Sequence, residues 1–246
     1  LNILPGYIVE ELIEKKNVHP KVYRHSTILF TDVVGSTVLW ERDPDSMGSL
    51  IARHDRLLES CVEEAGGQVH GLVESIGGEA ALDREHLARL KHLVGWLDPA
   101  AFSEHLAWSG HDGAFLNDLL PLPYTEAAIQ HISERISRAQ DFLRRQMLIE
   151  NLSSYVTYSS DAMTEWEFLS GIAQKADCYI LLDINNIYVN SVNHNYDPVE
   201  FMKGLPAERI AYAHIAGHFN EADDLIVDTH GADVIDNVWD LLDRAY

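Results

Sequence analysis

Histidine and carboxylate residues follow several short apolar runs in the second part of this sequence. Glu150 follows the run at 147–149, Asp183 follows the run at 178–182, and His214 lies within the run at 210–215. Imidazole and carboxylate together suit iron, manganese or zinc, and a carboxylate can bridge two cations. If these runs are parallel strands, their carboxyl ends meet at one mouth, and the pattern predicts a metal centre there.

Further residues of the same types occupy comparable places. His70 follows Val69, His105 follows the run that starts at Phe102, and Asp228 precedes His230 after the run at 225–227. Taken singly, each of these side chains can equally satisfy a buried strand end or cap a helix. Because a histidine or carboxylate ends almost every run, the whole set favours one shared site.

The elements that must position these residues alternate along the chain. Strands are expected at residues 26–31, 68–73, 102–106, 147–152, 178–183, 210–215 and 225–227. Helices are expected at residues 46–64, 83–96, 125–145, 164–176, 198–203 and 234–244. Thr125 is expected to cap the longest helix. This alternation predicts an α/β fold with mostly parallel strands, one of which, at 178–183, is buried on both faces.

A series of phrases between residues 70 and 246 resembles a known family, the MbnB-like multinuclear non-haem iron oxidases. The phrases are His70-Gly71, residues 75–78, 103–109, 118–124, 163–168, 181–190 and 214–218, Glu150-Asn151, Asn193-His194 and Asp228-Thr-His-Gly231. The resemblance implies a TIM-like (β/α) barrel with two or three irons at its mouth. It also implies O2-dependent modification of a peptide cysteine and a small partner protein that presents the peptide.

The same resemblance implies roles for individual residues. Those that match metal ligands are His70, His105, Glu150, Asp183, Asn186 and His214. Among them Glu150 is the expected bridging carboxylate, and Glu150 and Asp183 are the expected catalytic pair. Further candidates, as ligands or as residues that orient ligands, are His194, His218, Asp228 and His230.

Residues 1–69 resemble the opening of a class III nucleotidyl cyclase. Thr27 to Thr37 is similar to its first strand and phosphate loop, and Asp32 to the first of its two metal-binding aspartates. The second aspartate has no counterpart, and one aspartate cannot assemble a two-metal site. We therefore expect two fragments, at 1–69 and 70–246, and an incomplete barrel of about five strands. The strand at 26–31 could replace one missing neighbour.

Charge and cysteine content exclude several classes of function. The chain has 246 residues and a formal charge of −21, and residues 150–246 hold 17 acidic residues against four basic ones. Such a surface repels nucleic-acid phosphates and anionic lipid. Cys61 and Cys178 make no disulfide framework, and no signal peptide or membrane helix is expected. We expect a cytoplasmic protein whose exposed strand edges favour self-association.

The function expected from these observations is that of a multinuclear iron oxidase. It would act with O2 on a peptide or amino-acid thiol, with another divalent metal as the alternative to iron. The alternatives are a non-catalytic metal-binding or scaffold fragment and the remnant of a nucleotidyl cyclase.

Overall fold

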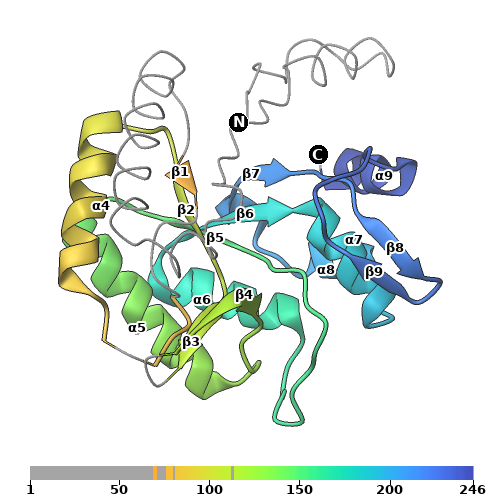
Figure 1. Cartoon of the computed structure of the whole chain (residues 1–246), viewed down its shortest axis with the longest axis horizontal. Helices are drawn as coiled ribbons and strands as arrows, with labels where there is room; N and C mark the ends of the chain where they lie inside the picture. The colour runs from red at the N-terminus through yellow and green to blue at the C-terminus, as the bar shows by residue number, and fades with distance from the viewer. Residues whose placement is uncertain (1–68, 71–75, 80, 112–113, 246) are drawn as a thin grey trace, which may run out of the picture. The chain divides into compact units, whose positions relative to one another are not determined.

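A parallel β-sheet forms the centre of the part of the chain that the structure describes (Figure 1). The structure is a computed structural model that describes residues 69–70, 76–79, 81–111 and 114–245. The strands of this sheet are β1 (Val69–His70), β2 (Phe102–His105), β5 (Leu148–Glu150), β6 (Tyr179–Asp183) and β7 (Ile210–His214). The expected strand at 26–31, the expected helix at 46–64 and most of the expected strand at 68–73 lie outside the described residues.

The order of the strands defines the connectivity. The order is β1-β2-β5-β6-β7, and all four pairings are parallel. Each new strand is thus added on the same side of the previous one, which is the winding of a (β/α) barrel and not of a doubly wound sheet. Among the described residues β1 and β7 are not paired with each other. The predicted α/β fold with parallel strands is confirmed.

Helices connect consecutive strands of the sheet (Figure 1). They are α4 (Arg84–Leu97), α5 (Glu126–Leu143), α6 (Glu165–Ala176), α7 (Ile184–Asn193) and α8 (Pro198–Lys203), and α9 (Asp236–Ala245) follows β7. The side chain of Thr125 accepts a hydrogen bond from the backbone N–H of Ala128, which confirms the predicted cap of α5. Thr164 and Glu167 form a reciprocal capping box at the start of α6. These caps satisfy N–H groups that the first turn of a helix leaves unpaired.

The core lies between the sheet and the helices. Ile149 of β5 and Ile180, Leu181 and Leu182 of β6 are almost completely buried, as expected for strands covered on both faces. The apolar stripes of α5 and α6 pack against each other. Burial of these side chains fixes the register of β5 and β6, and the register fixes where Glu150 and Asp183 emerge.

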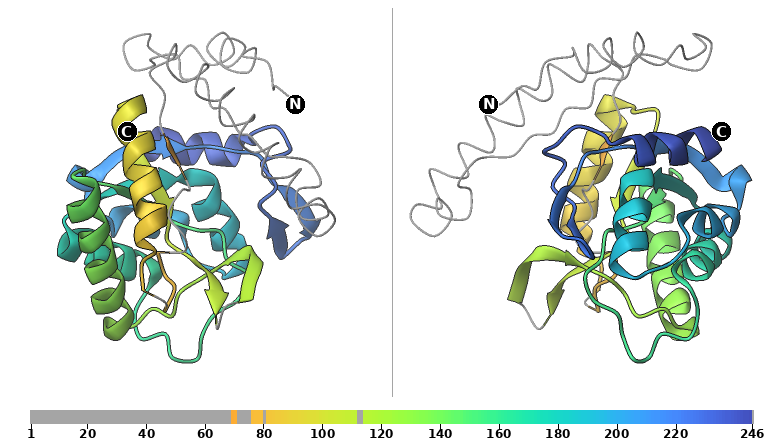
Figure 2. Two further views of the ribbon diagram at one scale, coloured as in Figure 1. Left: turned by 60° about the vertical axis from the view of Figure 1, so that its left-hand side comes forward. Right: turned by 90° about the vertical axis from the view of Figure 1, so that its right-hand side faces the viewer.

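Two antiparallel hairpins stand beside the sheet, as Figure 2 shows. One pairs β3 (Trp108–His111) with β4 (Ala114–Leu120), and the other pairs β8 (Phe219–Ala222) with β9 (Leu225–Val227). The hairpin of β3 and β4 and the helix α7 were not expected from the sequence. Among the described residues, no helix has the length and apolar character that a membrane crossing needs.

Candidate metal centre

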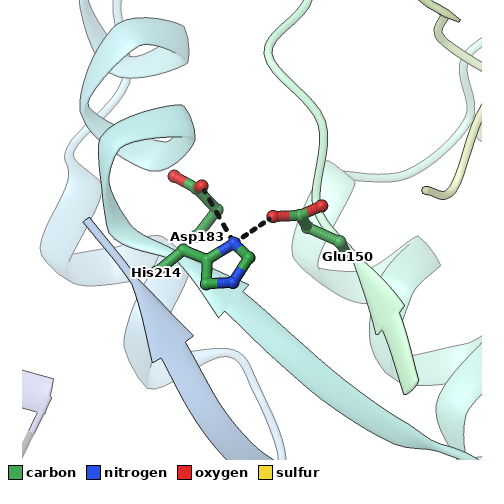
Figure 3. Close-up of side chains that lie close together, drawn as sticks. All are labelled: Glu150, Asp183 and His214. Atoms are coloured by element: carbon green, nitrogen blue, oxygen red, sulfur yellow. Dashed lines mark hydrogen bonds and ion pairs between the residues drawn. The ribbon is translucent and has the colours of Figure 1, made fainter. Parts of the chain in front are cut away.

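Glu150, Asp183 and His214 converge at the carboxyl ends of three adjacent strands (Figure 3). His214 Nδ1 lies 3.0 Å from Glu150 Oε1 and 3.9 Å from Asp183 Oδ2. One ligand atom from each residue lies within 4.8 Å of the other two. A single cation could therefore be reached by two carboxylates and one imidazole, a donor set that suits a first-row transition metal.

The register of the sheet explains this convergence. Asp183 is the direct neighbour of His214 across β6 and β7, and His105 is the direct neighbour of Glu150 across β2 and β5. Glu150 pairs with Leu181, which lies two residues before Asp183 and therefore on the same face of β6. All four side chains thus start from one face and one end of the sheet.

Asp183 is the most deeply placed carboxylate of this cluster. Its side chain is fully buried, and Oδ1 accepts a 2.7 Å hydrogen bond from the backbone N–H of Asn186 at the start of α7. Oδ2 has no hydrogen-bond partner among the described residues. Burial, and then the nearby Glu150 carboxylate, raise the pKa of Asp183 well above its ordinary value. A buried carboxylate oxygen without a donor is costly, and a bound cation would remove that cost.

Asparagine side chains hold the backbone around Asp183. Asn151 accepts a hydrogen bond from the Asp183 N–H and donates one to the Asp183 carbonyl, both at 2.9 Å. Asn186 Nδ2 donates to the carbonyl of Asn151 at 3.0 Å, while Asn186 Oδ1 is buried without a partner among the described residues. The amide oxygen of Asn186 is therefore a second buried acceptor without a donor among the described residues, and its role as a metal ligand stays a prediction.

Glu150 faces two imidazoles with its two oxygens. Oε1 faces His214, and Oε2 lies 3.5 Å from His105 Nε2. Each oxygen of Glu150 thus lies beside a different histidine, so this carboxylate could be shared by two cations. Sequence analysis missed Glu104, whose buried carboxylate accepts a 3.1 Å hydrogen bond from the backbone N–H of His105 and lies 3.9 Å from His105 Nδ1. Its position directly before a candidate ligand in the sequence was the signal that could have identified it.

A second polar cluster surrounds Asp228 near the same mouth. Asp228 Oδ1 lies 2.9 Å from His230 Nδ1 and accepts a 2.9 Å hydrogen bond from Asn185. The hydrogen bond with Asp228 raises the pKa of His230, and the charges of Asp183 and Glu150 act in the same direction. His218 Nδ1 lies 2.8 Å from Asn185 Oδ1, and its buried Nε2 has no partner among the described residues. Burial lowers the pKa of His218, so a neutral imidazole is favoured.

Two further predicted ligands, His70 and His194, are not part of the triad. For His70 only the position of the backbone is described. The backbone of His70 ends β1 beside Ser103 of β2. The Nε2 atom of His194 lies 2.9 Å from both the hydroxyl and the carbonyl of Ser154, so this nitrogen is engaged away from the triad. Cys178 is buried, and burial raises the pKa of its thiol to about 12, which leaves it unreactive.

The fold and this cluster define an α/β protein with a candidate metal centre at the carboxyl ends of its parallel strands. The sequence model of the RiPP precursor modification enzymes MbnB/TglH/ChrH matches residues 24–246. The chain belongs to this family. The matched region includes most of the segment for which a cyclase fragment was predicted, and no finding supports that fragment or a fusion of two families.

Curated relatives carry the name UPF0276 protein. The chain is 49% identical over 177 residues to the protein of Nitrosospira multiformis, a match that covers 72% of this chain and 62% of that protein. It is 44% identical over 214 residues to the protein of Shewanella loihica, with coverage of 87% and 76%. This chain therefore spans less than two thirds of the length of the Nitrosospira relative.

Solved structures give weaker likenesses. The 3-keto-D-glucoside 4-epimerase of E. coli is 13% identical, with a TM-score of 0.49 and coverage of 80% of this chain and 75% of that chain. A xylose isomerase-like TIM barrel protein from Mycobacterium smegmatis is 16% identical, with a TM-score of 0.40 and coverage of 65% and 55%. Neither likeness bears on the chemistry of this chain.

Proposed function

We propose that this chain modifies a peptide precursor at a cysteine thiol, with O2 as the oxidant and a centre of two or three irons. The observation that carries the proposal is the position of Glu150 between His105 and His214. Its support is the family to which the chain belongs, whose description names RiPP precursor modification.

The residues of the centre would bind two ions. Glu150, Asp183 and His214 would hold one ion, and His105 with the second oxygen of Glu150 would hold another. Bound iron would supply a Lewis acid for the substrate thiol and the redox capacity that reaction with O2 requires.

The surrounding residues keep this donor set in place. Asn151 fixes the backbone of Asp183 on both sides, and the Asn186 N–H orients Oδ1 so that Oδ2 faces His214. The Glu104 carboxylate accepts the backbone N–H of His105 and lies 3.9 Å from Nδ1 of its ring. Since the ligands are held before any ion arrives, binding needs little rearrangement of the protein.

A small protein that presents the peptide belongs to the same proposal, as does a site of action in the cytoplasm. The partner would bring the cysteine to the carboxyl ends of the strands, where the candidate ligands lie. Mixing a candidate partner with the chain and measuring the rate of peptide modification would test this part separately.

Oxygen uptake tests the proposed reaction. The chain, loaded anaerobically with Fe(II), is mixed with a cysteine peptide and with the matched serine peptide in an oxygen-electrode cell. We expect uptake with the cysteine peptide, loss of that uptake in Glu150→Gln, and no change in Glu208→Gln, which alters an exposed glutamate. Equal uptake with both peptides, or in both variants, would refute the proposal. Bound iron without uptake would favour the non-catalytic alternative.

A further inference from the structure

A cavity separate from the metal centre lies beside the first turn of α6. Its volume is about 260 Å³. Its lining includes four aromatic side chains, Tyr124, Tyr158, Trp166 and Tyr196. Since one water molecule takes up roughly 30 Å³ of liquid volume, the cavity has room for a side chain or a small organic ion.

The charged groups of this cavity are all of one sign. Its lining holds the carboxyl groups of Asp161 and Glu165 and the imidazole of His194, and none of its fourteen lining residues is a lysine or an arginine. The two oxygens of Asp161 accept the backbone N–H groups of Tyr124 and Tyr158, at 2.8 and 2.9 Å. Both oxygens of Asp161 are therefore used in hydrogen bonds that stabilise the loop. Glu165 is the acidic residue of the cavity that can pair with a ligand.

Glu165 is half-buried and lines the cavity together with the phenols of Tyr124 and Tyr196. Its Oε2 accepts a 3.2 Å hydrogen bond from Asn190 of α7. It also lines a smaller neighbouring cavity with Asn151 and Leu152. Burial raises the pKa of Glu165 to about 8, and the Asn190 hydrogen bond opposes that change. Burial and the charge of Glu165 together raise the pKa of Tyr124 and of Tyr196.

We infer that this cavity is a binding site for an alkylammonium group, which pairs with Glu165 and lies among the aromatic rings of Tyr124, Tyr158, Trp166 and Tyr196. Aromatic faces attract organic cations, and a desolvated carboxylate without a basic partner completes such a site. The two carboxyl groups disfavour anions, and a bound cation would stabilise the ionised form of Glu165, which burial otherwise disfavours.

The position of the cavity indicates where its ligand could come from. Ser154 lines the cavity, and Glu150 of the candidate metal centre lies four residues earlier in the chain. Four residues span at most roughly 14 Å, so the two sites lie within reach of one short peptide. If the proposed function holds, the cavity would take a lysine side chain of the peptide substrate while a cysteine lies at the metal. A free amine is the other source of the same chemistry.

Calorimetric titration of the metal-free protein tests the inference independently of the oxidase proposal. The probes are n-butylammonium, the N-acetyl methylamide of lysine, and the matched derivative of norleucine, which has the same four-carbon side chain without the terminal ammonium group. We expect both cations to bind at least about tenfold more tightly than norleucine. Tighter binding of the lysine derivative than of butylammonium would identify a peptide as the source, and the reverse would identify a free amine.

The protonation of Glu165 gives a second readout. A bound cation favours the ionised carboxylate, so binding at neutral pH should release a proton. Affinity should rise about tenfold per pH unit below the pKa of Glu165 and level off above it. The titratable groups around Glu165 are Tyr124, Tyr196, Tyr158, Asp161 and His194. Titration in buffers of different ionisation enthalpy measures the released proton.

Variants complete the test. Glu165→Gln keeps the shape of the side chain and should weaken cation binding at least about tenfold and abolish the proton release. Glu208→Gln should change neither. Equal binding of the lysine and norleucine derivatives to the unaltered protein, or no binding of either, would overturn the inference. This holds whether or not the variants fold and bind.

Discussion

Substitution of Asp183 by asparagine should stabilise the metal-free protein and remove its metal affinity. Asp183 caps α7 through Oδ1, and asparagine is as good a cap as aspartate, so the start of the helix should be preserved. What changes is a fully buried carboxylate whose Oδ2 has no partner among the described residues. The substitution removes that group and its repulsion with Glu150.

The expected gain in stability can be derived from the distance between the two carboxylates. Two carboxylate charges within 4.8 Å of each other repel by at least about 3.5 kcal/mol at an effective dielectric constant of about 20. The raised pKa of Asp183 reduces that repulsion, because part of the population is neutral. We expect a net gain of about 1–2 kcal/mol, which for a chain of this size raises Tm by roughly 2–8 °C.

Thermal unfolding with a chelator and with added Fe(II) or Mn(II) measures both effects. At a metal concentration about 100 times Kd, binding should stabilise the unaltered protein by about 2.7 kcal/mol, and Asp183→Asn should lose this gain. The exposed substitution Asp240→Asn should keep it. A lower Tm of metal-free Asp183→Asn, together with a normal metal-induced rise, would refute the reasoning.

Three further predictions concern residues around the cavity: the helix cap Thr164, the hydrogen-bonding Asn190 and the acidic Glu165. Thr164→Ala removes one half of the capping box of α6 and should lower the free energy of unfolding by about 1 kcal/mol in chemical denaturation. Asn190→Ala leaves the Ser154 N–H and the Leu152 carbonyl without their 2.8 Å partner and should cost about 3 kcal/mol, whereas Asn237→Ala, on an exposed residue, should cost under about 0.5. An Asn190 loss no larger than the Asn237 loss would contradict the assigned role. The pKa of Glu165 is raised from 4.5 to about 8, so the folded protein binds more protons than the unfolded chain between these values, and stability should fall as pH rises through that window. Glu165→Gln should flatten this dependence in a pH series of unfolding curves, and an unchanged slope would contradict the burial of this carboxyl.

The parts of the fold set by local pattern could be predicted from the sequence. Strands β5, β6 and β7 are short apolar or β-branched runs, and Thr125 and Thr164 begin helices with ordinary capping side chains. Glu150, Asp183 and His214 were predictable because each ends its strand, and parallel strands bring such residues together.

Helix α7 could not be predicted in this way. Its ten residues include four asparagines, Asn185, Asn186, Asn190 and Asn193, and asparagine is a poor helix former. In the fold each of these side chains makes hydrogen bonds to other segments, which offset the low propensity. Those contacts depend on the conformation of loops that are distant in the sequence, and so does the cavity around Glu165. Neither helix α7 nor this cavity can therefore be recognised from a local sequence pattern.

Metal content per chain tests the central claim most directly. The protein is purified without oxygen, reconstituted with Fe(II), freed of loosely bound ion and analysed by mass spectrometry of the metal. The proposed centre predicts at least two irons per folded chain, lost in Glu150→Gln and in His214→Ala and retained in the exposed controls Glu208→Gln and His92→Ala. No iron in the unaltered protein, or equal iron in site and control variants, would contradict it.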